Sequence, residues 1–441
     1  MKFSSLGLAP ELQKALVVCG YKNMTPVQEQ AIIPARRGKD LLVNAQTGTG
    51  KTAAFALPVL QQLIDQAEPV KPGKVRALIL TPTRELAEQL AETIGAYAQF
   101  LPLRITALFG GVKLGGQASQ LKAGVDVLIA TPGRLLEHIE LNHVDLTEAQ
   151  FVVLDEADRM LDMGFIADAQ KIIEQTAVNR QTLLFSATTT PAMNELAHKI
   201  LKSHREIRVT KANATAETVN HVAYPVSEER KMDLFLDLLA EHNWFQVLVF
   251  TSTKKQADHL LVRLKKAQVK SALCHGDKSQ GSRRRALADF KAGKVQVLLA
   301  TEVAARGLDI EGLEVVVNYN LPFLPEDYVH RIGRTGRAGK SGQAISFICR
   351  EEEHTLDRIQ RVIGSEVKRI YKRGYEVSER ETLRKGIVAK PKAKRVQKPS
   401  HNAVLKTNKT QGGQTKKAVK RKSKPITSRA GGKKSKTGKR K

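Results

Sequence analysis

The segment from residue 45 to residue 52 has the residue types of a phosphate-binding loop. It reads Ala-Gln-Thr-Gly-Thr-Gly-Lys-Thr, after the apolar run Leu41–Val43 and before the helix-like run Lys51–Ile64. Glycines at two positions let successive backbone N–H groups turn inward around phosphate oxygens, and the positive end of the following helix dipole strengthens the attraction. Lys51 would then reach the β- and γ-phosphates of a nucleotide, and Thr52 would bind Mg²⁺.

A Gly-rich turn without a ligand is the competing interpretation, but the position between a strand and a helix argues against it. The common form of this loop has Gly where Ala45 stands, so the loop is a variant. The residues predicted to hold the nucleotide here are Ala45, Gln46, Thr47, Gly48, Thr49, Gly50, Lys51 and Thr52.

An acidic quartet follows another apolar run. Asp155-Glu156-Ala157-Asp158 comes directly after Phe151–Leu154, which puts carboxylates at the carboxyl edge of a parallel sheet, where open α/β sheets bind ligands. Asp155 suits a water-mediated contact to Mg²⁺, and Glu156 suits activation of the water that attacks a γ-phosphate. Alone, such a quartet is more often a solvated helix start. Together with the loop, it predicts ATP hydrolysis with Lys51, Asp155 and Glu156 as catalytic residues.

These segments require sheets that bring strand ends together. Short runs rich in Val, Ile and Leu alternate with amphipathic stretches in two successive series, which is typical of buried parallel strands. The expected strands are Leu41–Val43, Ala77–Leu80, Val125–Ala130, Phe151–Leu154 and Thr182–Phe185, then Val247–Phe250, Ser271–Cys274, Val295–Ala300, Val315–Val317 and Ala344–Ile348. Because 441 residues exceed what one core usually holds, the pattern predicts two α/β domains in tandem.

The polar stretch Ser203–His221 has no clear periodicity, and we expect the connection between the domains there. The predicted domains cover residues 1–207 and 208–378, followed by a tail at 379–441. From Arg384 to Lys441 the chain has 22 Lys and Arg and no Asp, Glu or aromatic residue, a composition that predicts disorder. The rest carries 50 basic and 44 acidic residues, so most of the net charge of +28 lies in the tail.

Several classes of protein are disfavoured by the composition. Three widely spaced cysteines without a CxxC pair favour neither a disulfide framework nor a zinc site. The first residues lack the apolar segment of a signal peptide, and no run of about 18 apolar residues occurs. We therefore expect a cytoplasmic protein without membrane contact.

The acidic quartet spells D-E-A-D, and with the other motifs the chain resembles the DEAD-box RNA helicase family over about residues 3–350. Phe3, Gly20-Tyr21 and the stretch from Thr25 to Gln28 resemble the family's adenine-reading Q motif. The resemblance implies that Gln28 hydrogen-bonds adenine, as an amide with both a donor and an acceptor can, and that Tyr21 stacks on the base. It also implies two RecA-like domains with a cleft between them, ATP and Mg²⁺ as cofactors, and Thr52 and Asp155 as metal contacts.

Other segments resemble the RNA-facing motifs of the family. Hydroxyls, Arg side chains and backbone N–H groups at Gly turns can contact phosphates and 2′-hydroxyls without reading bases. The RNA contacts that the resemblance implies are Arg84, Gly111, Thr131, Arg134, Ser252, Gly276, Arg283 and Thr301.

The run His330–Arg337 resembles the arginine-finger motif of the family. The resemblance assigns Arg334 and Arg337 to the γ-phosphate and Asp309 to a nucleotide contact from the second domain. A finger delivered across a cleft is worth about 10³–10⁵ in rate in well-studied NTPases, so hydrolysis would require closure of the domains. The resemblance also assigns the coupling of the ATP state to unwinding to four residues: Asp158, Ser186, Thr188 and His330.

One position departs from the family pattern: Glu302 stands where Asp is usual, which keeps the charge and adds a methylene of reach. Residues 160–165, 276–281 and 374–376 resemble the bacterial RhlE-type branch. That branch implies ribosome assembly or RNA turnover, with ribosomal precursor particles or RNA-degradation machinery as partners.

We therefore expect an ATP-dependent helicase that unwinds or remodels short RNA duplexes or RNA–protein complexes. An ATP-gated RNA clamp without unwinding stays open, because every residue above also serves clamping. A DNA translocase would share the phosphate loop but should lack the Gln28 motif and the D-E-A-D quartet. The basic tail would add electrostatic RNA binding, or would serve only solubility or targeting.

Overall fold

The computed structural model describes residues 1–46, 48–209, 219–305, 310, 312–336 and 342–376. They belong to one compact unit that spans Met1–Lys385. Three predicted site residues, Thr47, Asp309 and Arg337, lie outside the described residues, as does the segment 379–441 for which we predicted a disordered tail.

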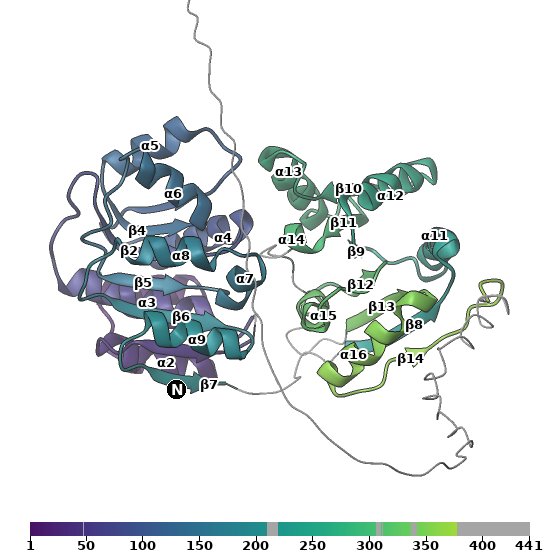
Figure 1. Ribbon diagram of the computed structural model, residues 1–441, viewed down its shortest axis with the longest axis horizontal. Helices are drawn as coiled ribbons and strands as arrows, with labels where there is room; N and C mark the ends of the chain where they lie inside the picture. The colour runs from purple at the N-terminus through teal and green to yellow at the C-terminus, as the bar shows by residue number, and fades with distance from the viewer. Residues whose placement is uncertain (47, 210–218, 306–309, 311, 337–341, 377–441) are drawn as a thin grey trace, which may run out of the picture. The chain divides into compact units, whose positions relative to one another are not determined.

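The first domain contains a seven-stranded sheet in the order β3-β4-β2-β5-β6-β1-β7 (Figure 1). Its strand pairs are all parallel. The strands are β1 Leu41–Asn44, β2 Val75–Leu80, β3 Ile105–Leu108, β4 Val125–Ala130, β5 Phe151–Leu154, β6 Gln181–Ser186 and β7 Arg205–Arg208. The helices are η1 Phe3–Leu6, α1 Pro10–Val18, α2 Pro26–Arg36, α3 Lys51–Asp65, α4 Arg84–Tyr97, α5 Leu114–Lys122, α6 Pro132–Glu140, α7 Ala157–Asp162, α8 Ile166–Ile173 and α9 Pro191–Ile200.

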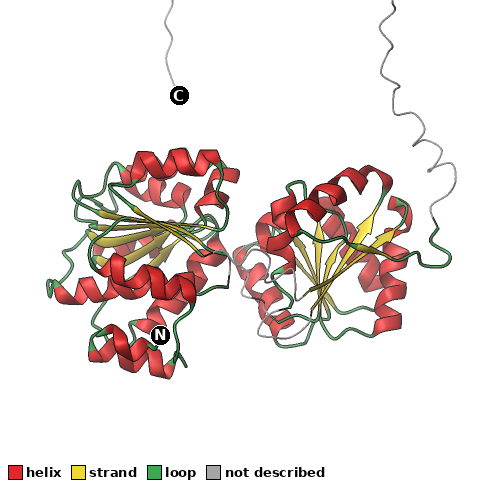
Figure 2. Cartoon of the chain, turned by 90° about the horizontal axis from the view of Figure 1, so that it is seen from below, coloured by secondary structure: helices red, strands yellow, loops and turns green. Residues whose placement is uncertain are grey.

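Helices cover both faces of this sheet (Figure 2). Because successive strand residues point to opposite faces, Leu41 and Val43 enter the core under α1–α4, whereas Leu42 enters the core under α5–α9. Burial on both faces explains why the strands read as nearly continuous apolar runs. Each fully buried Val or Leu stabilises the fold by about 1.5–3 kcal/mol.

The second domain repeats this arrangement strand for strand. Its parallel sheet has the order β10-β11-β9-β12-β13-β8-β14, so β8 takes the place of β1 and β12 that of β5. The strands are β8 Val219–Pro225, β9 Val247–Thr251, β10 Ser271–Cys274, β11 Val297–Thr301, β12 Val315–Asn318, β13 Gly342–Ile348 and β14 Lys368–Arg369. The helices are η2 Glu228–Arg230, α11 Lys231–His242, α12 Lys254–Lys266, α13 Gln280–Lys291, α14 Glu302–Ala305, α15 Pro325–Ile332, η3 Arg350–Glu352 and α16 Glu353–Ile363. The prediction of two parallel α/β domains in tandem is confirmed.

The stretch Ser203–His221, where we expected the connection between the domains, is described only at its two ends, because residues 210–218 lie outside the described residues. It contains β7, which pairs with β1, and the first residues of β8, which lies between β13 and β14. As an edge strand, β7 buries only Ile207, and this leaves no apolar run to recognise. In β8 the polar His221 is buried because its Nδ1 lies 3.0 Å from the Tyr328 hydroxyl. The predicted boundary between residues 207 and 208 falls inside β7.

The last described residues form a strap on α11. β14 extends the second sheet beside β8, and the following residues run along α11, where Lys372 pairs with Glu241. Tyr375 is buried, its hydroxyl donates to Asp237 at 2.6 Å, and Arg230 lies 4.4 Å from its ring centroid. These contacts anchor the last described residues to the second domain.

The strap gives a first prediction. Tyr375→Ala should destabilise the second domain by about 3 kcal/mol because it empties a packed ring site, whereas Tyr375→Phe should cost only about 1 kcal/mol for the missing hydrogen bond. Trp244, the single Trp of the chain, lies in the same core cluster, so its fluorescence during urea unfolding reports on this domain. Tyr371→Ala is the matched control, because Tyr371 is 69% exposed. Equal midpoints for Tyr371→Ala and Tyr375→Ala would contradict the anchoring role.

Candidate nucleotide and nucleic-acid site

The predicted site residues of the first domain lie along one edge of its sheet, at the carboxyl ends of the strands. Apart from Tyr21 and Gln28, which precede β1, those predicted to bind or hydrolyse the nucleotide follow β1 and β5. Ser186 and Thr188, predicted to couple the state of the nucleotide to unwinding, lie at the end of β6, and these three strands are neighbours. Those predicted to contact RNA follow β2, β3 and β4, which form the adjoining group. The strand order therefore divides one edge into two adjacent parts with different predicted ligands.

The phosphate loop leaves β1 and enters α3 through a left-handed residue. Gly48 and Gly50 have φ of +79° and +89°, values that favour glycine. The Thr49 hydroxyl donates to the Gln46 carbonyl at 2.7 Å, which closes the turn. Ala45 is buried in the first core cluster, and its N–H donates to the Ser186 carbonyl at 2.9 Å. The loop thus accommodates Ala in place of the usual Gly.

Lys51 opens α3 with its side chain held inside the loop. It is 6% exposed, and its ammonium nitrogen has no hydrogen-bond partner among the described residues. A buried charged group without a partner is costly unless a ligand supplies one. The position of Lys51 therefore fits an anion such as a nucleotide phosphate.

Gln28 is bound to the same loop. Its side-chain nitrogen donates to the Gly50 carbonyl at 3.1 Å, and its side-chain oxygen accepts from the Thr25 N–H at 2.8 Å. A Cβ added to Gly50 would lie 2.3 Å from the Gln28 nitrogen, so only Gly permits this contact. The sequence carried a signal for this structural role, because Thr-x-x-Gln is the spacing of a helix capping box.

Tyr21, which we predicted to stack on adenine, sits in an aromatic cluster. Its ring meets those of Phe3 and Tyr97 edge to face, with centroids 5.5 and 5.6 Å away, and its hydroxyl lies 2.7 Å from that of Tyr97. Burial, together with this contact, raises the pKa of Tyr97. The cluster fixes the Tyr21 ring, while Phe3 is buried beneath it.

The acidic quartet lies beside Lys51, as we expected. Asp155 is 4% exposed, and burial raises its pKa to about 6 although the nearby positive charge of Lys51 lowers it. A divalent cation would stabilise the ionised carboxylate, so the donor chemistry fits Mg²⁺. Glu156 has φ of +53°, a left-handed conformation that costs a non-glycine residue about 1–2 kcal/mol. Such strain is common where a side chain must be aimed at a reacting group.

Asp158 connects the quartet to the end of β6. One of its carboxylate oxygens accepts from the Ala187 N–H at 3.1 Å, from the Thr188 N–H at 3.1 Å and from the Thr188 hydroxyl at 3.2 Å. The Ser186 hydroxyl donates to the Thr188 carbonyl at 2.7 Å. A shift of the quartet would therefore move the Ser186–Thr188 turn with it, as the predicted coupling role requires.

The part of the edge predicted to face RNA is built around Gly110-Gly111. Gly111 has φ of +81°, and a Cβ there would lie 2.1 Å from a terminal nitrogen of Arg84. Arg134 donates to the Val112 carbonyl at 3.1 Å and to the Gln117 side-chain oxygen at 3.3 Å. Thr131 is the residue directly before α6, at its N-cap position. The structure thus brings together the four predicted RNA-contacting residues of this domain.

In the second domain, the predicted residues Ser252, Gly276 and Thr301 follow or end the neighbouring strands β9, β10 and β11. These strands correspond by position to β2, β3 and β4 of the first domain. Arg283, on α13, forms an ion pair with Glu85 at 2.7 Å. His330 lies at the end of α15, and the partly buried Arg334 lies two residues beyond the helix.

Arg331 in the arginine-rich run has a different role from its neighbours. It is 3% exposed, donates to the Asn318 side-chain oxygen at 3.1 Å and to the Asn320 carbonyl at 2.8 Å, and covers the Phe250 ring. It also pairs with Glu302, the residue that departs from the family pattern. Sequence reasoning missed this pair, because the two residues are far apart in the chain.

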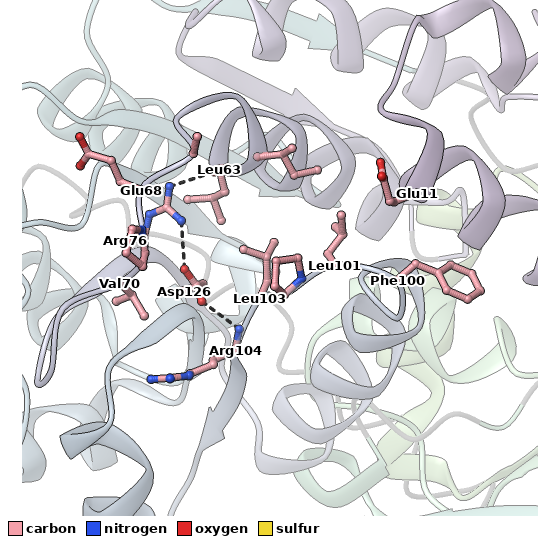
Figure 3. Close-up of a pocket in the computed structure, with 14 residues that line it drawn as sticks. Glu11, Leu63, Glu68, Val70, Arg76, Phe100, Leu101, Leu103, Arg104 and Asp126 are labelled. Carbon is pink, nitrogen blue, oxygen red and sulfur yellow. Dashed lines mark hydrogen bonds and ion pairs between the residues drawn. The ribbon is translucent and has the colours of Figure 1, made fainter.

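One cavity of the first domain, of about 410 Å³, lies away from these residues (Figure 3). Its lining includes Arg76 and Asp126, near the amino ends of β2 and β4, and their side chains pair at 3.0 Å. Leu63, Leu101 and Leu103 supply apolar walls. The cavity is thus at the opposite edge of the sheet from the phosphate loop. None of the described helices has the length and apolar composition that a membrane crossing requires.

Comparisons with known proteins agree with the motifs. A family model described as DEAD/DEAH box helicase matches residues 25–196, and one described as helicase conserved C-terminal domain matches residues 230–339. The DEAD-box ATP-dependent RNA helicase RhpA of Helicobacter pylori is 40% identical over 365 residues, which cover 83% of this chain and 73% of RhpA. The ATP-dependent RNA helicase RhlB of Pseudomonas syringae is 40% identical over 371 residues, which cover 83% of this chain and 94% of RhlB.

Solved structures give the same result. Saccharomyces cerevisiae Dbp5 bound to RNA and ADP-BeF3 has a TM-score of 0.75 at 30% identity and covers 87% of this chain and 99% of its own. Mss116 bound to single-stranded RNA and UDP-BeF has a TM-score of 0.76 at 28% identity, and the match covers 87% of this chain and 81% of the Mss116 chain. The predicted RecA-like fold of both domains is confirmed by this likeness.

The Glu302–Arg331 pair gives a second prediction. Glu302→Ala should destabilise the second domain by about 2 kcal/mol, because it leaves a buried guanidinium without its carboxylate, and Glu302→Asp should cost about half as much. Trp244 fluorescence during urea unfolding measures both. Glu229→Ala removes an exposed carboxylate that forms no ion pair with another described residue and should have no effect. Equal stability of Glu302→Ala and the wild type would show that the pair contributes nothing.

Proposed function

The chain belongs to the DEAD-box family of ATP-dependent RNA helicases, and from this premise we propose that it locally unwinds or remodels short RNA duplexes or RNA–protein complexes. The observation that carries the proposal is the shared sheet edge of the first domain. Residues suited to a nucleotide follow β5 and β1, residues suited to coupling lie at the end of β6 between them, and residues suited to an RNA backbone follow β2, β4 and β3. Because β2 pairs with β5, the two ligands would be held by one rigid sheet.

In the proposed hydrolysis, Lys51 binds the β- and γ-phosphates through its unpartnered ammonium, and the N–H groups of the phosphate loop surround the same oxygens. Thr52 and Asp155 would hold Mg²⁺, which when bound neutralises the charge that develops on the phosphate oxygens. Glu156, fixed by its left-handed backbone, accepts a proton from the attacking water. Gln28 and Tyr21 bind the adenine.

The second domain completes the site in this proposal. Arg334 and Arg337 stabilise the charge of the transition state, and Asp309 contacts the nucleotide. Ser252, Gly276, Arg283 and Thr301 bind the RNA backbone together with the motifs of the first domain. Asp158, Ser186, Thr188 and His330 transmit the state of the nucleotide. Three hydrogen bonds from the Ala187–Thr188 turn to Asp158 support this transmission.

We further propose a cytoplasmic setting in ribosome assembly or RNA turnover, with ribosomal precursor particles or RNA-degradation machinery as partners. The resemblance of residues 160–165, 276–281 and 374–376 to the RhlE-type branch supports this setting. RhlB, RhpA and CshA are matched at 40–42% identity. Assignment to one branch therefore rests on these segments.

A third prediction tests the hydrolysis. Glu156→Gln should bind ATP and RNA normally, but its RNA-stimulated turnover should fall about 10²–10⁴-fold, because the amide cannot accept the proton. Phosphate release, measured with and without RNA, reports turnover, and Glu174→Gln on the exposed end of α8 is the control. Normal turnover in Glu156→Gln would overturn the assignment.

The same proteins distinguish unwinding from clamping. The wild type should displace the short strand of an RNA duplex with ATP but not with a non-hydrolysable analogue. Retention of RNA in the presence of the analogue, combined with no displacement in ATP, would identify a clamp. A DNA duplex in place of RNA should stimulate turnover far less.

A fourth prediction concerns the basic tail, which we propose adds electrostatic affinity for RNA. Removal of Arg384–Lys441 deletes 22 positive charges. RNA affinity should fall, and the slope of log affinity against log salt should become shallower by about 0.7–0.9 for each RNA phosphate that the tail neutralises in the full chain. Titration of labelled RNA across salt concentrations measures both quantities. A tail of scrambled order should restore both, and an unchanged slope after truncation would leave solubility or targeting as its role.

A further inference from the structure

A buried chain of polar side chains lies behind the predicted RNA-facing residues of the first domain. Gln117 on α5 is 7% exposed, and His138 on α6 is fully buried. The His138 Nε2 lies 3.3 Å from the Gln117 side-chain oxygen, and the His138 Nδ1 lies 3.0 Å from the Nδ1 of His143. The same Gln117 oxygen accepts from Arg134 at 3.3 Å. None of these contacts belongs to the phosphate site.

The hydrogen-bond partners of these polar side chains determine which atom donates and which accepts in each contact. The Gln117 side-chain nitrogen donates to the Phe109 carbonyl at 3.3 Å, so its oxygen must be the acceptor for both Arg134 and His138. His138 therefore carries its proton on Nε2, and its Nδ1 accepts from the Nδ1–H of His143. Burial lowers the pKa of His138, and the nearby His143 and Arg134 lower it further. The lowered pKa favours this neutral form.

These polar side chains hold both ends of the Gly110-Gly111 turn. Gln117 binds the carbonyl of Phe109, just before the glycines, and Arg134 binds the carbonyl of Val112, just after them. On its other side the turn lies against the Arg84 guanidinium. One amide, oriented by His138, thus sets the position of the turn and the direction of Arg134.

We propose that Gln117 and His138 are positioning residues for RNA binding, which hold the Gly110-Gly111 turn and Arg134 in the geometry that an RNA backbone requires. The proposal rests on the RNA contacts proposed above for Gly111 and Arg134. Apolar side chains could fill the same space without the cost of burying an amide and an imidazole. Gln117 and His138 instead have hydrogen-bond partners for their polar atoms, and a buried network with such partners specifies one arrangement, on which a backbone-reading site depends.

The test measures RNA-stimulated ATP hydrolysis as a function of RNA concentration. Gln117→Leu should raise the KM for RNA about tenfold, because it removes an acceptor of a charged donor and a donor to the turn. The kcat at saturating RNA and the KM for ATP should stay within about twofold of the wild type, since the hydrolytic residues follow other strands. Gln120→Leu, an exposed change on the same helix, should have no effect.

Variants of His138 test how these polar side chains affect RNA binding. His138→Leu should raise the KM for RNA about threefold, because Gln117 is then without one of its orienting bonds. His138→Gln places an amide nitrogen near the former Nε2 and should restore affinity, whereas His138→Asn places one near Nδ1 and should not. The double variant Gln117→Leu/His138→Leu should match Gln117→Leu alone, since His138 acts through Gln117.

Arg134→Ala separates failure of this inference from failure of the proposed function. If Arg134→Ala raises the KM for RNA but Gln117→Leu and His138→Leu do not, the positioning role is overturned and the RNA site stands. If Arg134→Ala has no effect, the RNA contact proposed for Arg134 fails, and the positioning role fails with it. Lower thermal stability and kcat with an unchanged KM for RNA would reduce Gln117 and His138 to core residues, while rescue by His138→Gln but not His138→Asn supports the proposal.

Discussion

The structure depends on one constraint: parallel strands that are buried on both faces end at a common edge. Burial sets the apolar character of the strands, and the parallel direction places each following loop at the same side of the sheet. Residues that are far apart in sequence, such as Lys51, Asp155 and Thr188, meet because β1, β5 and β6 are neighbours. The order of the strands, more than any single contact, decides which residues share a ligand.

Polar groups at this edge are arranged for ligands at a cost to the fold. The Lys51 ammonium has no hydrogen-bond partner among the described residues, Asp155 has a raised pKa, and Glu156 has a strained backbone. Groups perturbed in this way gather at functional sites because the ligand, rather than the protein, completes their interactions. The opposite pattern holds behind the Gly110-Gly111 turn, where the polar atoms of Gln117 and His138 have hydrogen-bond partners within the chain. The first arrangement suits a ligand that comes and goes, and the second suits a surface of fixed shape.

The strands buried on both faces and the motif segments could be predicted from sequence, because continuous apolar runs and loop chemistry are local signals. β7 and β14 could not, because each is an edge strand whose pairing leaves little apolar pattern. β8 was hidden by Asn220 and by His221, whose burial depends on Tyr328, distant in the chain. The pairing of Glu302 with Arg331 and the contact of Gln117 with His138 are also tertiary, so no spacing rule exposes them. The motif resemblance identified Arg134 but not the groups that hold it.

The repeated strand order also places a lysine at equivalent positions of the two domains, in different surroundings. Lys231 begins α11 after β8, as Lys51 begins α3 after β1, so the two lysines occupy equivalent positions. Lys231 is fully buried, and its ammonium pairs with Glu228 at 2.8 Å and Glu352 at 2.7 Å. Burial alone would lower the pKa of Lys231, but these carboxylates raise it. The preceding residues, Ser227–Arg230, contain no glycine that could turn N–H groups inward. In the second domain two carboxylates of the chain take the place that a phosphate would occupy beside Lys51, so the same topology leaves one lysine open to a nucleotide and closes the other.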